Sequence, residues 1–258
     1  MQDPVMNRTD AATEFRLALS LFSRLPAGSL PVLPPGSLGA AVWCFPLVGA
    51  LIGLLAGIAG LVAHGLGLGI WGVAIAIIAA EILITGGLHE DGLADVADGL
   101  GGRDVASRLA IMRDSRIGSF GSLALFLSLA ARLVLLAQIG TGWGAGGLVF
   151  AAIAANAGAR LALVLPLALL DPARPDGLGA SVGRIDGERA LSGAVFAFGI
   201  GIVCLGWGVL PAALAVVIAG LVAVAVGRDR FGGFTGDLLG AAACLGLVFG
   251  LVAIAGHV

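Results

Sequence analysis

The sequence predicts an all-α integral membrane protein with about seven transmembrane helices. Hydrophobic residues make up 59% of the 258 positions and charged residues only 12%, whereas soluble domains carry roughly 25% charged residues. The 43 glycines favour the same class, because small residues let transmembrane helices approach closely. The apolar runs lack the strict alternation of a membrane β-barrel. We therefore expect one polytopic membrane domain over residues 1–258, embedded in a lipid bilayer.

Seven apolar runs are long enough to be transmembrane helices, since a helix needs about 20 apolar residues to cross a bilayer. An eighth segment, residues 14–26, is too short to cross and mixes Arg16 and Arg24 with apolar side chains. This pattern predicts an amphipathic helix lying in the membrane interface. The seven predicted spans are 39–63, 66–88, 118–139, 146–170, 190–208, 209–226 and 237–256.

The arginines predict the orientation of these spans. The chain has no lysine, and twelve of its 14 arginines fall before the first span or in alternate loops. Positively charged loops stay cytoplasmic, so we expect the N-terminus inside and the C-terminus outside. The net charge of -2 argues against nucleic acid as a partner.

The stretch "GGLHEDGLADVADGLGG" from residue 86 follows the second predicted span and is rich in carboxylates. Asp91, Asp95 and Asp98 are spaced i, i+4, i+7, which places them on one face of a helix. Three such carboxylates repel one another, and a hard divalent cation with oxygen ligands would offset the repulsion. Glu90 lies about 100° round the helix from Asp91 and is a further candidate ligand outside this face. The alternative is a solvated acidic cap on a membrane helix.

Two neighbours of these carboxylates add to the prediction. Gly92 has no side chain, which would allow a phosphate to approach the acidic face. His89 is either a base or ligand, or a structural residue that forms hydrogen bonds at the helix end. We expect residues 89–117 to form a cytoplasmic active-site segment.

A basic stretch, "RLAIMRDSRIGSFG", follows at residues 108–121. Arg113 and Arg116 are spaced i, i+3 and are expected to share a helix face, where guanidinium groups bind phosphate oxygens in bidentate fashion. Ser115 and Gly118 would add hydroxyl and backbone donors at the start of the third span, because a helix N-terminus favours anions. Positive-inside anchoring is the alternative. An acidic face followed by a basic one is what Mg²⁺ and a pyrophosphate would need.

Three further features complete the candidate site. Thr235 and Asp237 open the last span, either as substrate contacts or as helix caps. Arg160 falls inside a predicted span, where a charge needs a partner or a wet cavity; Glu81 is one candidate partner. The Pro/Gly-rich loop 171–189 is expected to act as a lid or substrate loop.

These motifs resemble the adenosylcobinamide-GDP ribazoletransferase (cobalamin synthase) family. The resemblance is carried by "FRLALSLFSRLP", "FPLVGALIG", "TGGLHEDGLADVADGL", "IMRDSRIGSFG", "DPARPDGLG" and "GGFTGDLLGA", in order from residue 15 to residue 241. One departure follows the last motif. The family pattern leads us to expect a polar or acidic pair where this chain has Ala243 and Cys244.

The resemblance implies a Mg²⁺-dependent reaction of vitamin B12 synthesis in a bacterial inner membrane. Adenosylcobinamide-GDP and α-ribazole, or α-ribazole 5′-phosphate, would give a cobamide and GMP, and the enzyme would work as a monomer or a homo-oligomer. From the spacing we assign Asp91 and Asp95 to Mg²⁺. In the reaction that the resemblance implies, Arg113 and Arg116 would neutralise the charge developing on GMP. Asp98 either completes the metal site or acts as the base. The predicted catalytic residues are Asp91, Asp95, Asp98, Arg113 and Arg116; the substrate-binding residues are His89, Gly92, Asp114, Ser115, Gly118, Arg160, Thr235 and Asp237; the metal ligands are Asp91, Asp95, Asp98 and Glu90.

Two other functions compete with this one. A CDP-alcohol phosphotransferase also spaces aspartates on a membrane helix, but its signature has an arginine that the run D-G-L-A-D-V-A-D lacks. A transporter would place acidic residues deep within its spans, whereas most acids here lie at the predicted cytoplasmic edge.

Overall fold

The computed structural model describes residues 10–32, 36–174, 182–183 and 185–257, and this part of the chain contains helices and no strand. Its one isolated β-bridge joins Pro172 and Phe234. The predicted all-α class is confirmed. The elements in order are α1 (Ala11–Phe22), α2 (Ser37–Ala40), η1 (Ala41–Cys44), α3 (Phe45–Gly65), α4 (Ile70–Thr85), α5 (Leu88–Gly99), α6 (Val105–Ile111), α7 (Ser119–Ala162), α8 (Val164–Leu169), α10 (Gly187–Leu205), η2 (Gly206–Gly208), α11 (Val209–Val226), η3 (Gly227–Phe231) and α12 (Gly236–Ala255).

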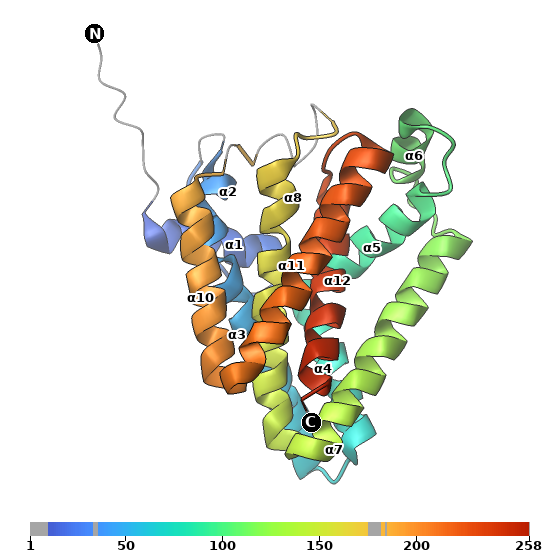
Figure 1. The fold of residues 1–258 in the computed structure, drawn as a ribbon. Coiled ribbons are helices and arrows are strands. Elements are labelled where there is room, and N and C mark those ends of the chain that lie inside the picture. Colours follow the sequence, from blue (N-terminus) through green and yellow to red (C-terminus); the bar gives the residue numbers. More distant parts are fainter. Residues whose placement is uncertain (1–9, 33–35, 175–181, 184, 258) are drawn as a thin grey trace.

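Four helical stretches of the described chain are long and apolar enough to cross a membrane, or five if the bent pair α4–α5 forms one span. The protein is therefore a multi-pass membrane protein. Figure 1 shows that α7 doubles back at its middle and that the chain reverses again between α10 and α11. The first reversal falls at Gly144, which has φ 72° and ψ 178°, and the second at η2. The count of seven spans stays a prediction.

Helix α1 begins and ends earlier than the predicted segment 14–26, and it is anchored to the bundle. Its Glu14 is buried and accepts hydrogen bonds from Trp43 Nε1 at 2.7 Å and from Arg189 Nη1 at 2.5 Å. Figure 1 shows α1 lying across the end of the bundle where α6 and α8 also lie, opposite the C-terminus. Its location in a membrane interface stays a prediction.

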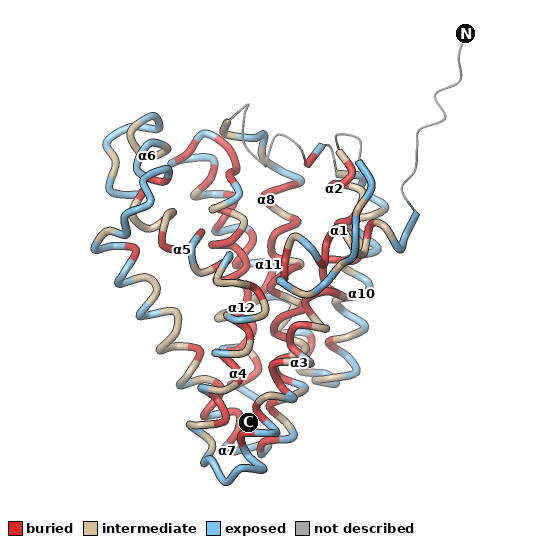
Figure 2. Tube along the Cα trace, turned by 180° about the vertical axis from the view of Figure 1, so that it is seen from behind, coloured by how far each residue is buried: buried red, intermediate tan, exposed pale blue. Residues whose placement is uncertain are grey.

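Close helix contacts in the bundle depend on small residues, as the glycine content predicts. A Cβ on Gly49 or Gly53 of α3 would come within 2.3 Å of a backbone oxygen of α7, so only glycine permits this approach. Figure 2 shows buried positions along the inward faces of α3, α7 and α12 and exposed positions on the outside. The outer surface includes large apolar side chains such as Phe126 and Val203, which suits contact with lipid.

The chain turns sharply between α4 and α5, and this turn positions the acidic helix. Gly86 and Gly87 have φ 72° and 74°, a left-handed conformation that residues with a side chain adopt only at a cost. The two helices meet at 88°. Helix α5 has 12 residues and is too short to cross a membrane by itself.

Candidate functional site

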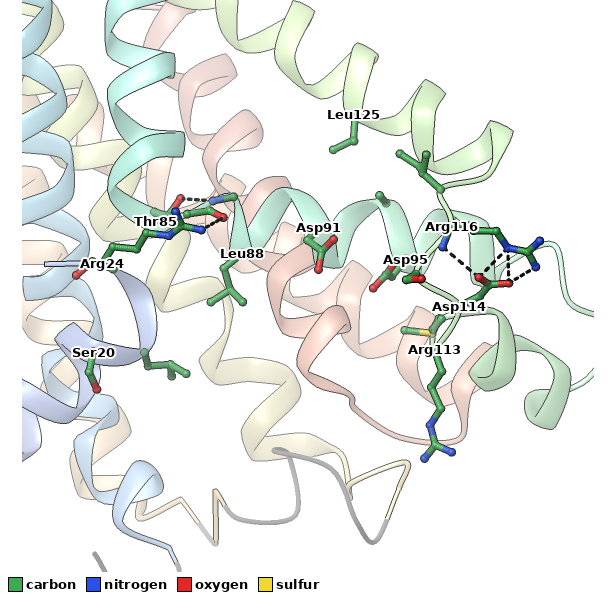
Figure 3. Close-up of a pocket in the computed structure, with 18 residues that line it drawn as sticks. Ser20, Arg24, Thr85, Leu88, Asp91, Asp95, Arg113, Asp114, Arg116 and Leu125 are labelled. Atoms are coloured by element: carbon green, nitrogen blue, oxygen red, sulfur yellow. Dashed lines mark hydrogen bonds and ion pairs between the residues drawn. The ribbon is translucent and has the colours of Figure 1, made fainter. Parts of the chain in front are cut away.

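A pocket of ≈810 Å³ lies between α1, α5 and the loop that joins α6 to α7. Figure 3 shows Asp91 and Asp95 projecting from α5, with Arg24 on one side of them and Arg113 and Arg116 on the other. The pocket thus brings the acidic and basic motifs of the sequence to one place. The predicted site residues that line it are Asp91, Asp95, Arg113, Asp114, Ser115 and Arg116.

Asp91 and Asp95 lie one turn apart on α5, as the i, i+4 spacing predicts. Asp91 is exposed and Asp95 is half-buried. Burial, together with the negative charges of Asp91, Asp237 and Asp98, raises the pKa of Asp95 to about 6, while Arg174 opposes the shift. Asp95 therefore lies in an environment that favours a proton or a cation beside it.

Asp98 is on the same helix, but its carboxylate faces the start of α7. The backbone N–H groups of Gly118 and Gly121 donate hydrogen bonds to its two oxygens at 2.7 and 2.8 Å. The anion-binding helix N-terminus predicted for a substrate phosphate, including Gly118, is thus occupied by a carboxylate of the chain itself. In this conformation Asp98 fixes α5 to α7 and does not line the pocket, so neither metal binding nor base catalysis is needed to explain it.

The expectation that Arg113 and Arg116 share a helix face is wrong. Helix α6 ends at Ile111, and both arginines lie on the following loop and point in different directions (Figure 3). The loop is held by Asp114, whose carboxylate accepts hydrogen bonds from the backbone N–H of Arg116 at 3.1 Å and from its guanidinium at 2.7 Å. These contacts lower the pKa of Asp114 to about 2, so the loop carries an ion pair at neutral pH.

Arg24 is a pocket residue that sequence reasoning missed. Its backbone N–H donates to the carbonyl of Ile84 at 2.7 Å, which holds the chain after α1 against the α4–α5 turn. Its side chain lines the pocket with Ser20, Ser23 and Thr85. The motif "FSRLP" contains this residue, but the sequence predicts it only as part of an interfacial helix. Nothing in the local sequence indicates that residue 24 lies beside residue 86.

The predicted site residues Glu90, His89 and Arg160 lie on the other side of α5, in the interior of the bundle. Glu90 accepts a hydrogen bond from Arg132 Nη1 at 2.7 Å, and Arg132 also forms an ion pair with Glu81. Arg160 does not pair directly with Glu81; its Nη1 donates to Asn156 Oδ1 at 2.7 Å, and Asn156 donates to Glu81. We call these five residues, Glu81, Glu90, Arg132, Asn156 and Arg160, the buried charge network.

A small polar cavity of ≈10 Å³ opens onto the network and is lined by Ala243 and Cys244. These are the positions where the family pattern predicts polar or acidic side chains. His89 also lines the cavity, and its Nε2 is buried without a hydrogen-bond partner among the described residues. A space of this size matches a single water molecule, which would satisfy His89.

The two predicted site residues at the start of α12 have different places: Thr235 caps the helix, and Asp237 lines a cavity. Thr235 is the N-cap of α12 and accepts a hydrogen bond from the backbone N–H of Leu238 at 3.1 Å, which is the capping alternative. Asp237 lines a second cavity together with Asp91. Gly92 packs against α12, because a Cβ there would lie 2.7 Å from the Asp237 carbonyl oxygen. The space expected at Gly92 for a phosphate is filled by α12.

The carboxylates that we expected to form one metal site are divided by this geometry. No three His, Cys, Asp or Glu side chains of the described chain come together as a metal site. Asp98 is hydrogen-bonded to α7 and Glu90 to Arg132, so Asp91 and Asp95 remain on the pocket wall. A pair of carboxylates suits Mg²⁺, which usually takes one or two protein carboxylates and completes its shell with water and substrate phosphates.

Comparisons with known proteins identify the same family that the sequence motifs resemble. A family model described as cobalamin-5-phosphate synthase matches residues 14–255. An adenosylcobinamide-GDP ribazoletransferase of Bradyrhizobium diazoefficiens is 40% identical over 88% of this chain and 87% of its own. Proteins of the same name from Mesorhizobium japonicum and Rhizobium etli are 42% and 39% identical, over 87% and 92% of this chain and 86% and 94% of theirs. No solved structure matches the chain.

Proposed function

Because the chain belongs to the cobalamin-5-phosphate synthase family and is a transferase of cobalamin biosynthesis, we propose that it joins adenosylcobinamide-GDP to α-ribazole or α-ribazole 5′-phosphate with the help of Mg²⁺. The observation that carries the proposal is that Asp91, Asp95, Arg113 and Arg116 line one pocket. The competing functions, a CDP-alcohol phosphotransferase and a transporter, are set aside because the family match covers residues 14–255.

The reaction is a substitution at phosphorus. The acceptor hydroxyl attacks the phosphorus that carries the cobinamide, a new P–O bond forms, and the P–O bond to GMP breaks. The hydroxyl proton leaves to a base, and GMP departs with the electron pair of the broken bond. Such catalysis consists mostly of positioning and charge neutralisation, which is what a pocket lined by carboxylates and arginines supplies.

Asp95 and three arginines of the pocket have distinct roles in this proposal. Asp95 is the candidate base, because a pKa of about 6 lies near the operating pH. Arg113 and Arg116 neutralise the charge on the departing GMP, and Arg24 holds the donor's phosphates from the opposite wall. The loop that carries Arg113 and Arg116 is exposed, so a bound phosphate can replace the contacts that these side chains now make, including the ion pair of Arg116 with Asp114.

Magnesium is part of the proposal, and Asp91 and Asp95 would hold it. When bound, it would neutralise the pyrophosphate oxygens and bring the donor to α5. The role of Asp95 as base and its role as ligand are alternatives, and the metal dependence of its variants separates them.

We also propose that the pocket opens to the cytoplasm of a bacterial cell, across its inner membrane. The support is that α6 with Arg108, and the segment Gly227–Phe231 with Arg228 and Arg230, lie at the same end of the bundle as α1 (Figure 1), and positively charged segments remain cytoplasmic. Both substrates are charged or polar, so a pocket at this end receives them without a membrane crossing.

The test measures GMP release from adenosylcobinamide-GDP and α-ribazole by the purified protein, with Mg²⁺ or with EDTA. We expect Mg²⁺-dependent release by the wild type and a loss of at least ~100-fold in Asp95→Asn, the lower end for removal of a general base. Asp229→Asn is the matched control, since Asp229 is exposed and outside the pocket. Release that survives in Asp95→Asn, or no release from the wild type, would contradict the proposal.

A further inference from the structure

A second cavity adjoins the polar pocket, and Asp91 lines both. Its volume is ≈150 Å³ and its walls are mostly apolar, with Phe22 of α1, Phe45 of α3, Leu163, and Leu167 of α8 among them. Asp237 is the other carboxylate on its wall. The cavity therefore combines an apolar interior with two carboxylates, and one of them, Asp91, also lines the polar pocket.

Aromatic rings give this cavity a firm wall. Phe22 meets Phe45 edge to face, with ring centroids 4.7 Å apart, a favourable arrangement of two aromatic rings. Phe22 also stacks on His89, with ring centroids 5.9 Å apart and an interplanar angle of 20°. Phe22, Phe45 and His89 are all buried, so the wall is fixed by packing before a ligand arrives.

We propose that this cavity binds the uncharged aromatic base of the acceptor nucleoside, with the ribose beside Asp91 and Asp237. The inference rests on the proposed function, in which α-ribazole is the acceptor. An engineered apolar cavity of about 150 Å³ binds benzene, so the space suits a flat ring system. Ionised carboxylates accept hydrogen bonds only, and the ribose hydroxyls are donors that match them.

The position of the cavity would bring the acceptor hydroxyl close to the pocket that is proposed for the donor's pyrophosphate. A base in the cavity directs its sugar toward Asp91, and Asp91 also faces the pocket proposed for the pyrophosphate. The acceptor hydroxyl then lies near Asp95, one helical turn from Asp91. The guanine of the donor fits the cavity poorly, because its polar edge would lack partners among the apolar side chains. A lipid acyl chain would match the apolar walls but would make no use of the two carboxylates.

Gly236 provides a way to fill the cavity. It is the first residue of α12 and lines the cavity, and a Cβ built on it meets no atom within 4 Å. Gly236→Leu therefore places a side chain in open space. Gly187→Leu is the matched control, because Gly187 is the first residue of α10, also follows a side-chain N-cap, and also has open space around its Cβ.

The experiment compares KM for both substrates in the two variants and the wild type. We expect Gly236→Leu to raise KM for α-ribazole at least ~10-fold, the lower end of the effect of one methylene on discrimination, and to leave KM for adenosylcobinamide-GDP within about twofold, within ordinary context variation. The riboside of unsubstituted benzimidazole, which has a smaller base, should be affected less. Gly187→Leu should change neither KM.

A second variant keeps the test informative if Gly236→Leu does not fold. Leu167→Ala enlarges the cavity and should favour ribosides with bulkier bases over α-ribazole. An unchanged acceptor preference in Leu167→Ala, or equal effects of Gly236→Leu on both KM values, would overturn the base-binding site. Lipid-dependent activity that changes while the acceptor KM does not would assign the cavity to an acyl chain, which also overturns it. A wild type that releases no GMP with any acceptor would instead contradict the proposed function.

Discussion

Replacing Asp95 by asparagine should lower activity at least ~100-fold and at the same time stabilise the metal-free protein. Partial burial and the negative charges around Asp95 raise its pKa from the usual 3.8 to about 6. A raised carboxyl pKa means that ionisation costs free energy in the folded state. The cost grows as pH rises from about 4 to about 6 and is complete above that pH, so the neutral amide removes it most fully at pH 8.

The size of the effect follows from the pKa. Each pKa unit corresponds to 1.36 kcal/mol, so a shift of about two units sets an upper limit of ~3 kcal/mol. Asp95 is only half-buried, and screening by solvent reduces this to ~1 kcal/mol. For a chain of this size we expect the apparent Tm in EDTA at pH 8 to rise by ~2 to 4 °C.

The assay is thermal unfolding in detergent, followed through the four tryptophans. The stabilisation by Asp95→Asn should shrink at pH 5, where the folded wild type already carries the proton. Mg²⁺ should raise the Tm of the wild type, because a ligand of the folded state stabilises it, and should raise that of the variant less. Asp229→Asn should have no effect in either condition. A variant that is less stable than the wild type in EDTA at pH 8 would refute the reasoning.

Three further predictions test the structural residues around the site. Asp98→Asn replaces an acceptor of two backbone hydrogen bonds and should destabilise the protein by ~2 kcal/mol, measured by urea or thermal unfolding. If the stability were unchanged and the Mg²⁺ requirement altered, Asp98 would be a metal ligand after all. Gly87→Ala should cost about 1 kcal/mol and reduce activity, because φ is 74° although a Cβ has open space. Gly146→Ala, with equal space in a helix, should keep the Tm or raise it slightly because alanine favours the helix, and equal Tm values for these two variants would count against strain at the turn. Arg132→Met leaves the buried Glu81 and the partly buried Glu90 without their arginine and should cost ~3 to 5 kcal/mol. Arg116→Met on the exposed loop should leave the Tm unchanged, and similar Tm values for these two variants would mean that the ion pairs of Arg132 add nothing.

The sequence predicted the features that depend on neighbouring residues. The i, i+4, i+7 spacing correctly placed Asp91, Asp95 and Asp98 on one helix, because helical periodicity is local. The interruption of the helix predicted between the spans 118–139 and 146–170 is confirmed, because Gly144 has non-helical backbone angles. Periodicity failed after Ile111, where Asp114 accepts a hydrogen bond from the backbone of Arg116. This local side-chain contact competes with helix formation.

The sequence could not predict which distant segments meet. Asp98 finds its partners 20 and 23 positions later, at the start of α7, and Glu90 and Arg132 are 42 positions apart. Both carboxylates share the composition and spacing of a metal site, so only tertiary packing distinguishes them from Asp91 and Asp95. The contribution of Arg24 to the pocket depends on the same packing, because the α4–α5 turn brings Thr85 and Gly86 beside α1.

The buried charge network also constrains how the chain enters its membrane. Helix α4 carries Glu81 and α7 carries Arg132 and Arg160, and each helix alone would present charge to lipid at a cost of about 2.5 to 3.5 kcal/mol per residue for Arg or Asp at the helix centre. Glu81 is synthesised 51 positions before Arg132, so α4 emerges from the ribosome while its counter-charge is still untranslated. Glu81 of α4 therefore has no counter-charge until α7 is made. The charge on each helix is compensated only when the two helices pack together in the bilayer.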